Sequence, residues 1–155
     1  MTQSGSDPRF FADAMLGRLA KRLRLAGFDT LYERSIADAD LVTRARAEGR
    51  IIVTRDRRLA QRRLARDAVV LVADRVDAQW REITLRMPDL LHGDALSRCA
   101  ECNGVLVELP TEEARPLVPP YVAQTQRVFS RCPACGRVYW AGTHVERIRR
   151  ALETK

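Results

Sequence analysis

Two pairs of cysteines near the C-terminus constrain the fold of this chain more than any other feature. The pairs share the spacing Cys-x-x-Cys, lie 29 residues apart, and consist of Cys99, Cys102, Cys132 and Cys135. Asn103-Gly104 follows the first pair and Gly136 the second, and these residues let the backbone curl so that its amides face the sulfurs. Four thiolates in two such turns are typical of a closed, structural Zn²⁺ site in a zinc ribbon.

Other uses of paired cysteines fit less well. Disulfides are disfavoured because residues 1–8 are polar and lack the apolar segment of an export signal, and cytosolic thiols stay reduced. An iron–sulfur cluster would use the same ligands, but the symmetric spacing favours zinc. No apolar run approaches the roughly 20 residues that span a bilayer. We therefore expect a cytoplasmic protein without a membrane partner.

The composition of the chain changes near residue 97. Residues 1–97 contain no cysteine and two of the seven prolines, whereas residues 98–155 contain all four cysteines and the other five prolines. This change predicts a first domain over residues 8–92 and a zinc ribbon over 97–145. A basic terminal helix is expected over 146–155.

The first part of the chain alternates between strand-like and helix-like segments. Strands are expected at 9–13, 28–32, 51–54 and 69–72, and helices at 15–26, 38–48, 56–66 and 76–87. Four such units imply a parallel sheet with helices on both faces. The predicted fold class is α/β, a parallel sheet flanked by helices and followed by a small C-terminal zinc ribbon.

Aspartates gather at one edge of this predicted sheet. Asp13 ends the first strand, Asp38 opens the second helix and Asp56 follows the third strand, with Asp40 and Asp74 as additional acids. Ligands of open parallel sheets bind outside the carboxyl ends of the strands. Converging carboxylates repel each other unless a cation compensates, and oxygen ligands suit Mg²⁺ or Mn²⁺. Such an ion can activate water and stabilise charge on a phosphoryl group.

Each acid also has a structural explanation. Asp38 and Asp56 stand where helix N-caps are expected, and Asp40 would complement the dipole of the same helix as Asp38. Asp13 would need a cationic partner, such as Arg18 or Lys21. The coincidence of three acids at one edge favours the metal site over these separate explanations.

The excess of basic residues fits a polyanionic partner. There are 27 basic against 20 acidic residues, and all but two of the basic residues are arginine. A genome that prefers arginine codons explains this bias equally well. The candidate nucleic-acid contacts are Arg18, Lys21, Arg55, Arg57, Arg58, Tyr139 and His144. Aromatic residues of the ribbon would stack on bases, or else form its core.

Several strings in the chain resemble one known family, the PIN-like RNase domain family named for the C-terminal part of the Mut-seven exonuclease. They are Asp13-Ala-Met-Leu-Gly-Arg-Leu-Ala20, Leu23-Arg-Leu-Ala-Gly-Phe-Asp-Thr30, Thr54-Arg-Asp56, Cys99-x-x-Cys-Asn-Gly104, Val118-Pro-Pro-Tyr121, Cys132-Pro-x-Cys-Gly-Arg-Val-Tyr-Trp140 and Gly142-Thr-His144. The resemblance covers residues 9 to about 148. It implies a PIN-like fold and a metal-dependent ribonuclease whose acidic positions match Asp13, Asp38 and Asp56.

The expected function is hydrolysis of RNA phosphodiester bonds through the aspartate cluster, with structural Zn²⁺ and catalytic Mg²⁺ or Mn²⁺. The alternative is a non-catalytic RNA-binding or ribosome-associated zinc-ribbon module, in which the acids serve as caps and salt bridges. A toxin-type nuclease would in addition need an antitoxin-like protein partner. The assumed partner in the first two cases is RNA.

Overall fold

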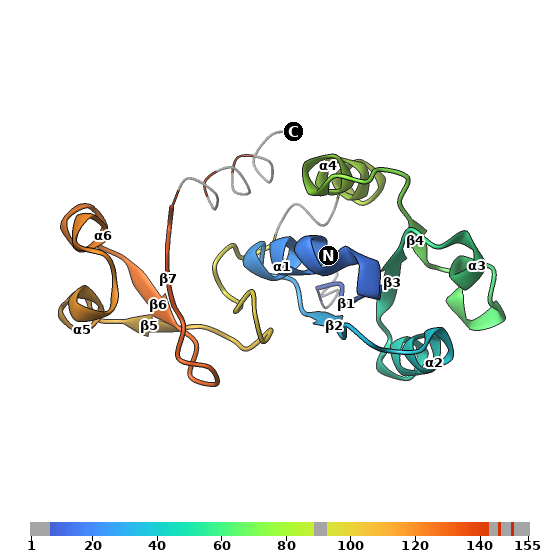
Figure 1. Cartoon of the computed structure of the whole chain (residues 1–155), viewed down its shortest axis with the longest axis horizontal. Helices are drawn as coiled ribbons and strands as arrows, with labels where there is room; N and C mark the ends of the chain where they lie inside the picture. The colour runs from blue at the N-terminus through green and yellow to red at the C-terminus, as the bar shows by residue number, and fades with distance from the viewer. Residues whose placement is uncertain (1–6, 89–92, 143–145, 147–149, 151–155) are drawn as a thin grey trace, which may run out of the picture.

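A computed structural model describes residues 7–88, 93–142, 146 and 150. These residues form two separate sheets (Figure 1). The first sheet is parallel with the strand order β2-β1-β3-β4, and the second is antiparallel with the order β5-β6-β7. This arrangement confirms the predicted α/β fold class with a small C-terminal ribbon. The expected terminal helix at 146–155 lies outside the described residues, apart from positions 146 and 150.

The parallel sheet is apolar on both faces. Its strands are β1 (Phe10–Ala12), β2 (Thr30–Tyr32), β3 (Ile51–Thr54) and β4 (Val69–Val70). Alternation along β1 sends Phe10 and Ala12 into one core and Phe11 into the other, and all three are fully buried. Burial on both faces explains why these strands read as continuous apolar runs rather than as alternating ones.

Helices cover each face of this sheet. A 3₁₀ turn, η1 (Ala14–Leu16), leads into α1 (Gly17–Leu25), which packs with α4 (Val76–Arg86) on one face. The opposite face carries α2 (Asp38–Glu48), α3 (Arg57–Ala60) and η2 (Arg63–Ala65). In Figure 1, α1 and α4 lie above the sheet and α2 below it. No helix in the described part of the chain has the length and apolar character needed to cross a membrane.

The single helix predicted over 56–66 is divided. α3 ends at Ala60, Arg62 adopts an extended backbone (φ −63°, ψ 139°), and η2 follows. Leu59 and Ala65 are both buried in the core beneath α2. The break between α3 and η2 allows both Leu59 and Ala65 to reach the same core.

The ribbon has its own small core. It consists of β5 (Val107–Leu109), β6 (Phe129–Arg131) and β7 (Val138–Trp140). The helical segments between β5 and β6 are α5 (Thr111–Ala114), η4 (Arg115–Leu117) and α6 (Pro120–Thr125). Leu109, Val122 and Phe129 are buried together, and Trp140 packs against them. This packing supports the structural role that the sequence left open for the aromatic residues of the ribbon.

The first cysteine turn of the ribbon rests on the amino-terminal end of β2. Arg24 of α1 is 6% exposed and donates hydrogen bonds to the carbonyls of Thr30 (2.8 Å), Ala100 (3.0 Å) and Glu101 (3.1 Å). Burial lowers the pKa of this guanidinium, an effect that the negative charge of the Cys99 and Cys102 thiolates opposes. One side chain therefore ties α1, β2 and the cysteine turn together.

The strand order also fixes where a ligand would bind. The chain runs from β1 outward to β2 and then returns across the sheet to β3, so the connections diverge between β1 and β3. In open parallel sheets, the crevice at such a point, outside the carboxyl ends of the strands, is where ligands bind. Asp13 follows β1 and Asp56 follows β3, so both aspartates lie at this edge of the sheet.

Candidate active site and metal centre

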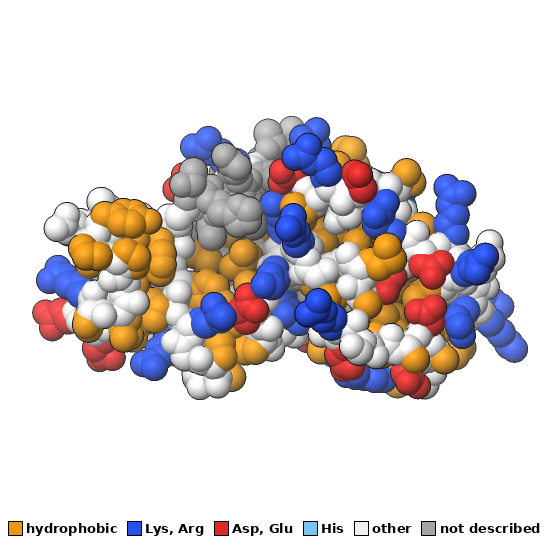
Figure 2. All heavy atoms as spheres, viewed as in Figure 1, with side chains coloured by type: hydrophobic (Ala, Val, Ile, Leu, Met, Phe, Trp, Pro, Cys, Tyr) orange, Lys and Arg blue, Asp and Glu red, His pale blue; other side chains and the backbone are white. Residues whose placement is uncertain are grey.

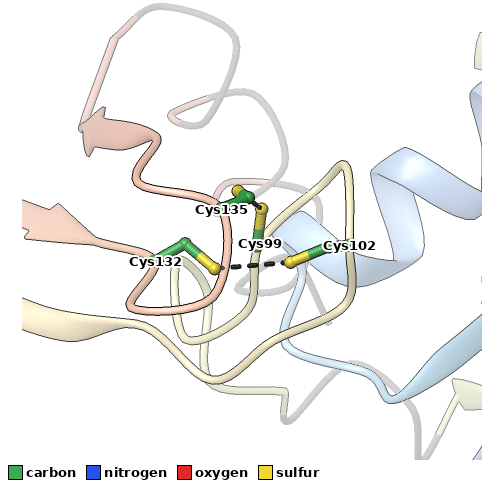
Figure 3. A group of neighbouring side chains, drawn as sticks. All are labelled: Cys99, Cys102, Cys132 and Cys135. Atoms are coloured by element: carbon green, nitrogen blue, oxygen red, sulfur yellow. Dashed lines mark hydrogen bonds between the residues drawn. The ribbon is translucent and has the colours of Figure 1, made fainter.

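The four cysteines converge on one point (Figure 3). The Sγ atoms of Cys99 and Cys135 are 3.5 Å apart, those of Cys102 and Cys132 are 3.3 Å apart, and all four lie within 4.8 Å of one another. Zinc–sulfur bonds of 2.3 Å in a tetrahedron place the sulfurs about 3.8 Å apart. The donor set and its spacing therefore fit a structural Zn²⁺ ion with no open coordination position.

Local backbone geometry builds this centre. Asn103 and Gly136 adopt left-handed conformations (φ 67° and 79°), as the Asn-Gly and Gly positions after the two pairs predicted. The amide of Asn103 donates to the carbonyl of Cys99 (2.9 Å), and the amide of Gly136 donates to the carbonyl of Cys132 (2.8 Å). Each turn thereby presents its two thiols on one side.

Tyr139 contacts the four-cysteine cluster, a role that the sequence did not predict. Its hydroxyl lies 3.0 Å from the Sγ of Cys99 and accepts a hydrogen bond from the amide of Ala100 (3.0 Å). Burial raises the pKa of Cys99, but hydrogen bonds from Tyr139 and from backbone amides lower it more, to about 6. Tyr139 was predicted as a nucleic-acid contact. Its hydroxyl is occupied at the cysteine cluster, so only its ring is available to stack on a base.

One hydroxyl links the acids at the ends of β1 and β3. Asp13 is 7% exposed, and its Oδ2 accepts a 2.8 Å hydrogen bond from Oγ1 of Thr54. The same Oγ1 accepts from the amide of Asp56 at 2.9 Å. Oδ1 of Asp56 accepts in turn from the amide of Arg58 at 2.8 Å and caps α3. The N-cap that the sequence offered as an alternative for Asp56 is thus present.

Asp13 has no cationic partner among the described residues. Lys21, one of the two partners considered from the sequence, pairs with Glu101 at 2.7 Å, and Arg18, the other, makes no ion pair within the described part of the chain. Oδ1 of Asp13 likewise accepts no hydrogen bond from these residues. Oδ1 of Asp13 is also not among the sealed, unpaired side-chain atoms of the described residues, so it is open to a cation that would supply the missing counter-charge.

The other predicted acids follow or precede elements at the same edge but do not form a tight cluster with Asp13 among the described residues. Asp38 is half-buried at the first position of α2, where Ala37 is the N-cap and no side chain caps the helix. Asp40 and Asp74 are exposed, in the first turn of α2 and in the loop between β4 and α4. Over the described ranges, only the four cysteines bring three or more ligand atoms within 4.8 Å of one another. The aspartates are therefore not gathered as tightly as the thiols.

The predicted basic contacts flank this edge. Arg57 and Arg58 are exposed at the start of α3, and Nε of Arg55 is buried without an acceptor among the described residues. Arg18 and Lys21 are exposed on α1 and line a hollow of about 940 Å³. His144 lies outside the described residues.

These features define a class of protein, an α/β domain with aspartates at the carboxyl edge of its parallel sheet and a four-cysteine cluster that can hold a metal. The family model described as Mut7-C RNAse domain matches residues 8–152, and the chain therefore belongs to this family. The match confirms the family predicted from the sequence strings and points to an RNA-related, nuclease-type role. No curated protein matches the chain, and no solved structure does.

Proposed function

We propose that this protein is a metal-dependent ribonuclease that hydrolyses RNA phosphodiester bonds at the carboxyl edge of the parallel sheet. The observation that carries the proposal is the buried carboxylate of Asp13. It lies at the carboxyl end of β1, beside β3, is oriented by Thr54, and has no counter-charge among the described residues. Membership of a family of RNase domains supplies the substrate class.

The residues at this edge fit a hard divalent cation. Asp13 has one oxygen without a hydrogen-bond donor, and Asp56 uses only Oδ1 for the cap of α3. Mg²⁺ and Mn²⁺ keep several waters and need only one or two protein carboxylates, so acids spaced more widely than the thiols suffice. When bound, such an ion supplies an activated water and neutralises charge on the phosphoryl oxygens.

The chain's own residues would orient the acids and hold the RNA. Thr54 fixes the Asp13 carboxylate through its hydroxyl, and Asp38, at the start of α2, would be a third acid at the same edge. Arg57 and Arg58 present exposed guanidinium groups beside Asp56 and would bind phosphates.

The test is cleavage of labelled single-stranded RNA by protein freed of divalent ions other than zinc, with and without added Mn²⁺. Asp13→Asn keeps the shape of the side chain and an oxygen for Thr54 but removes the charge. Asp67→Asn is the matched control because Asp67 is an exposed acid in the loop that precedes β4, remote from the carboxyl edge.

We expect cleavage that requires Mn²⁺, is lost in Asp13→Asn and is unchanged in Asp67→Asn. Cleavage by Asp13→Asn at the wild-type rate would overturn the assignment of the site. RNA binding without cleavage under every metal condition would instead support the non-catalytic RNA-binding module.

A further inference from the structure

Two hollows on the surface meet at Glu101. The larger, about 940 Å³, lies beside the start of α1, and its lining includes Ala14, Arg18 and Lys21 as well as Asp74 before α4. The smaller, about 440 Å³, lies on the ribbon. Glu101 lines both hollows, so they adjoin at this residue, and the two together are called the depression here. Its lining begins at Ala14, the residue next to Asp13, follows α1 and ends on the ribbon at Tyr139 and Trp140.

The depression is basic. Its lining includes seven basic residues against three acidic ones, and the basic residues are Arg18, Lys21, Arg24, Arg34, Arg75, Arg131 and Arg137. Basic side chains also extend across the middle of the molecule in Figure 2, between the ribbon and the parallel sheet. Arg18, Arg34 and Arg75 are exposed and have no hydrogen-bond or ion-pair partner among the described residues. A chain of phosphates would neutralise these charges.

The ion pair between Lys21 and Glu101, where the two hollows adjoin, is one that a ligand anion can replace. Lys21 and Glu101 are 2.7 Å apart, and their side chains are 52% and 37% exposed. Exposed pairs of this type contribute little to stability. A phosphate could therefore take the place of the Glu101 carboxylate on Lys21 without unfolding the segment that carries either residue.

The ribbon end of the depression suits unpaired bases. Tyr139 and Trp140 line it together with Arg131 and Arg137. Aromatic rings and guanidinium planes stack on bases only when the bases are unpaired, and arginines beside them bind the backbone. Both ends of the depression therefore fit the same ligand, an extended single strand of RNA.

We propose that the two hollows form one track for single-stranded RNA, in which the ribbon holds nucleotides several positions away from the bond at Asp13. The track deepens the proposed ribonuclease function and rests on it for the place of cleavage. In this arrangement Arg131 and Arg137 act only on RNA long enough to reach the ribbon. Arg18 and Lys21 contact the strand close to the acids.

The test measures RNA binding separately from cleavage. Asp13→Asn protein without added divalent ions is titrated with labelled oligouridylate, either about four or about twelve nucleotides long, both within the range of about 4–16 nucleotides that single-strand sites cover. The double variant Arg131→Gln/Arg137→Gln is compared with Arg115→Gln/Arg127→Gln. All four arginines are exposed residues of the ribbon, and only the first pair lines the depression.

We expect Arg131→Gln/Arg137→Gln to weaken binding of the longer RNA by about tenfold and to lower its salt slope by about 1.4, since each phosphate contact contributes about 0.7. The shorter RNA should be unaffected, and so should both lengths in the control variant. Equal losses in both variants, no loss in either, or equally tight binding of duplex RNA would overturn the track.

Failure of the track and failure of the ribonuclease are distinguishable. If wild-type protein cleaves with Mn²⁺ but Arg131→Gln/Arg137→Gln binds long RNA normally, the track is wrong and the enzyme stands. If wild-type protein never cleaves but the variants show the expected length-dependent loss, the track stands as a binding site and the ribonuclease is wrong.

Discussion

Thr54 hydrogen-bonds on both sides to aspartates of the candidate active site, because its hydroxyl donates to Oδ2 of Asp13 at 2.8 Å and accepts from the amide of Asp56 at 2.9 Å. Thr54 and Asp13 are 41 positions apart in the chain but lie at the ends of neighbouring strands. One buried hydroxyl thus sets the orientation of one acid and the position of the loop that carries the other.

Removing this hydroxyl should affect both stability and cleavage. Thr54→Val keeps the branched shape and leaves a buried carboxylate oxygen without its donor. We expect the free energy of unfolding to fall by about 1–3 kcal/mol, and Mn²⁺-dependent cleavage to fall by about tenfold or more. Urea unfolding and cleavage of labelled RNA measure the two effects. Thr54→Ser, which restores the hydroxyl, should recover most of the cleavage.

A surface threonine provides the control for this substitution. The hydroxyl of Thr43 bonds to the carbonyl of Ala39 within α2 and is exposed. Thr43→Val should change stability by no more than about 0.5 kcal/mol and leave cleavage unchanged. Full cleavage by Thr54→Val would show that Asp13 does not depend on Thr54 for its orientation.

Asp56 has two roles that substitution can separate. Its Oδ1 caps α3 through the amide of Arg58, and its charge belongs to the proposed metal site. Asn caps helices about as well as Asp, whereas Ala costs about 1 kcal/mol at an N-cap. We expect Asp56→Asn to keep wild-type stability and lose cleavage, and Asp56→Ala to lose both. Thermal unfolding and RNA cleavage measure the two; an active Asp56→Asn would reduce Asp56 to a cap.

The sequence predicted most of the secondary structure because its signals are local. The helix expected at 38–48 and the strand expected at 51–54 have the same bounds in the structure. The break after Ala60 was not predicted, because the segment from Arg57 to Arg66 contains neither Gly nor Pro. There the burial of Leu59 and Ala65 in one core decides the conformation, and that core depends on tertiary packing.

The same distinction separates the two centres. Cys-x-x-Cys followed by Asn-Gly or Gly specifies a turn within six residues, so the four-cysteine cluster could be predicted from spacing alone. The contact of Thr54 with Asp13 depends on how β3 is placed beside β1, and the contact of Arg24 with Glu101 joins residues 77 positions apart. No local sequence pattern around these residues indicates which distant residue each of them contacts.

The acid stability of the protein should depend on Asp29. Burial raises the pKa of this carboxyl, but hydrogen bonds from Arg50 and Asn103, together with the charge of Arg50, bring it below the usual 3.8. A group whose pKa is lowered by folding stabilises the native state above its unfolded pKa, and this contribution disappears as the pH falls through the folded value. The native state should therefore lose stability below about pH 3.8.

Asp29→Asn tests this dependence. It should lower stability at neutral pH, where the ion pair with Arg50 is intact, and flatten the loss of stability below pH 3.8. Denaturant unfolding from neutral pH down through this range measures both effects. Asp67→Asn, at an exposed acid without a described partner, should follow the wild-type profile. A profile for Asp29→Asn as steep as that of wild type would contradict the prediction.

Zinc should protect one particular amide of the parallel sheet. Asn103, in the turn after Cys102, accepts a hydrogen bond from the amide of Thr30 (3.0 Å) and donates to Oδ1 of Asp29 (2.7 Å). Thr30 begins β2, an edge strand, and its amide faces away from β1. The cysteine turn therefore covers a part of the sheet edge that solvent would otherwise reach.

Removal of zinc with a chelator should release this turn and expose the amide of Thr30. We expect hydrogen exchange at Thr30 to become faster by roughly tenfold or more, because its partner belongs to a segment held by the metal. The amide of Phe10, which bonds to the carbonyl of Asp29 at 2.8 Å inside the sheet, is the control and should keep its protection. Exchange at both amides, followed by nuclear magnetic resonance before and after chelation, distinguishes local release from unfolding. Unchanged protection of Thr30 in zinc-free protein would show that the turn holds its shape without the metal, and equal losses at both amides would show that zinc stabilises the whole sheet.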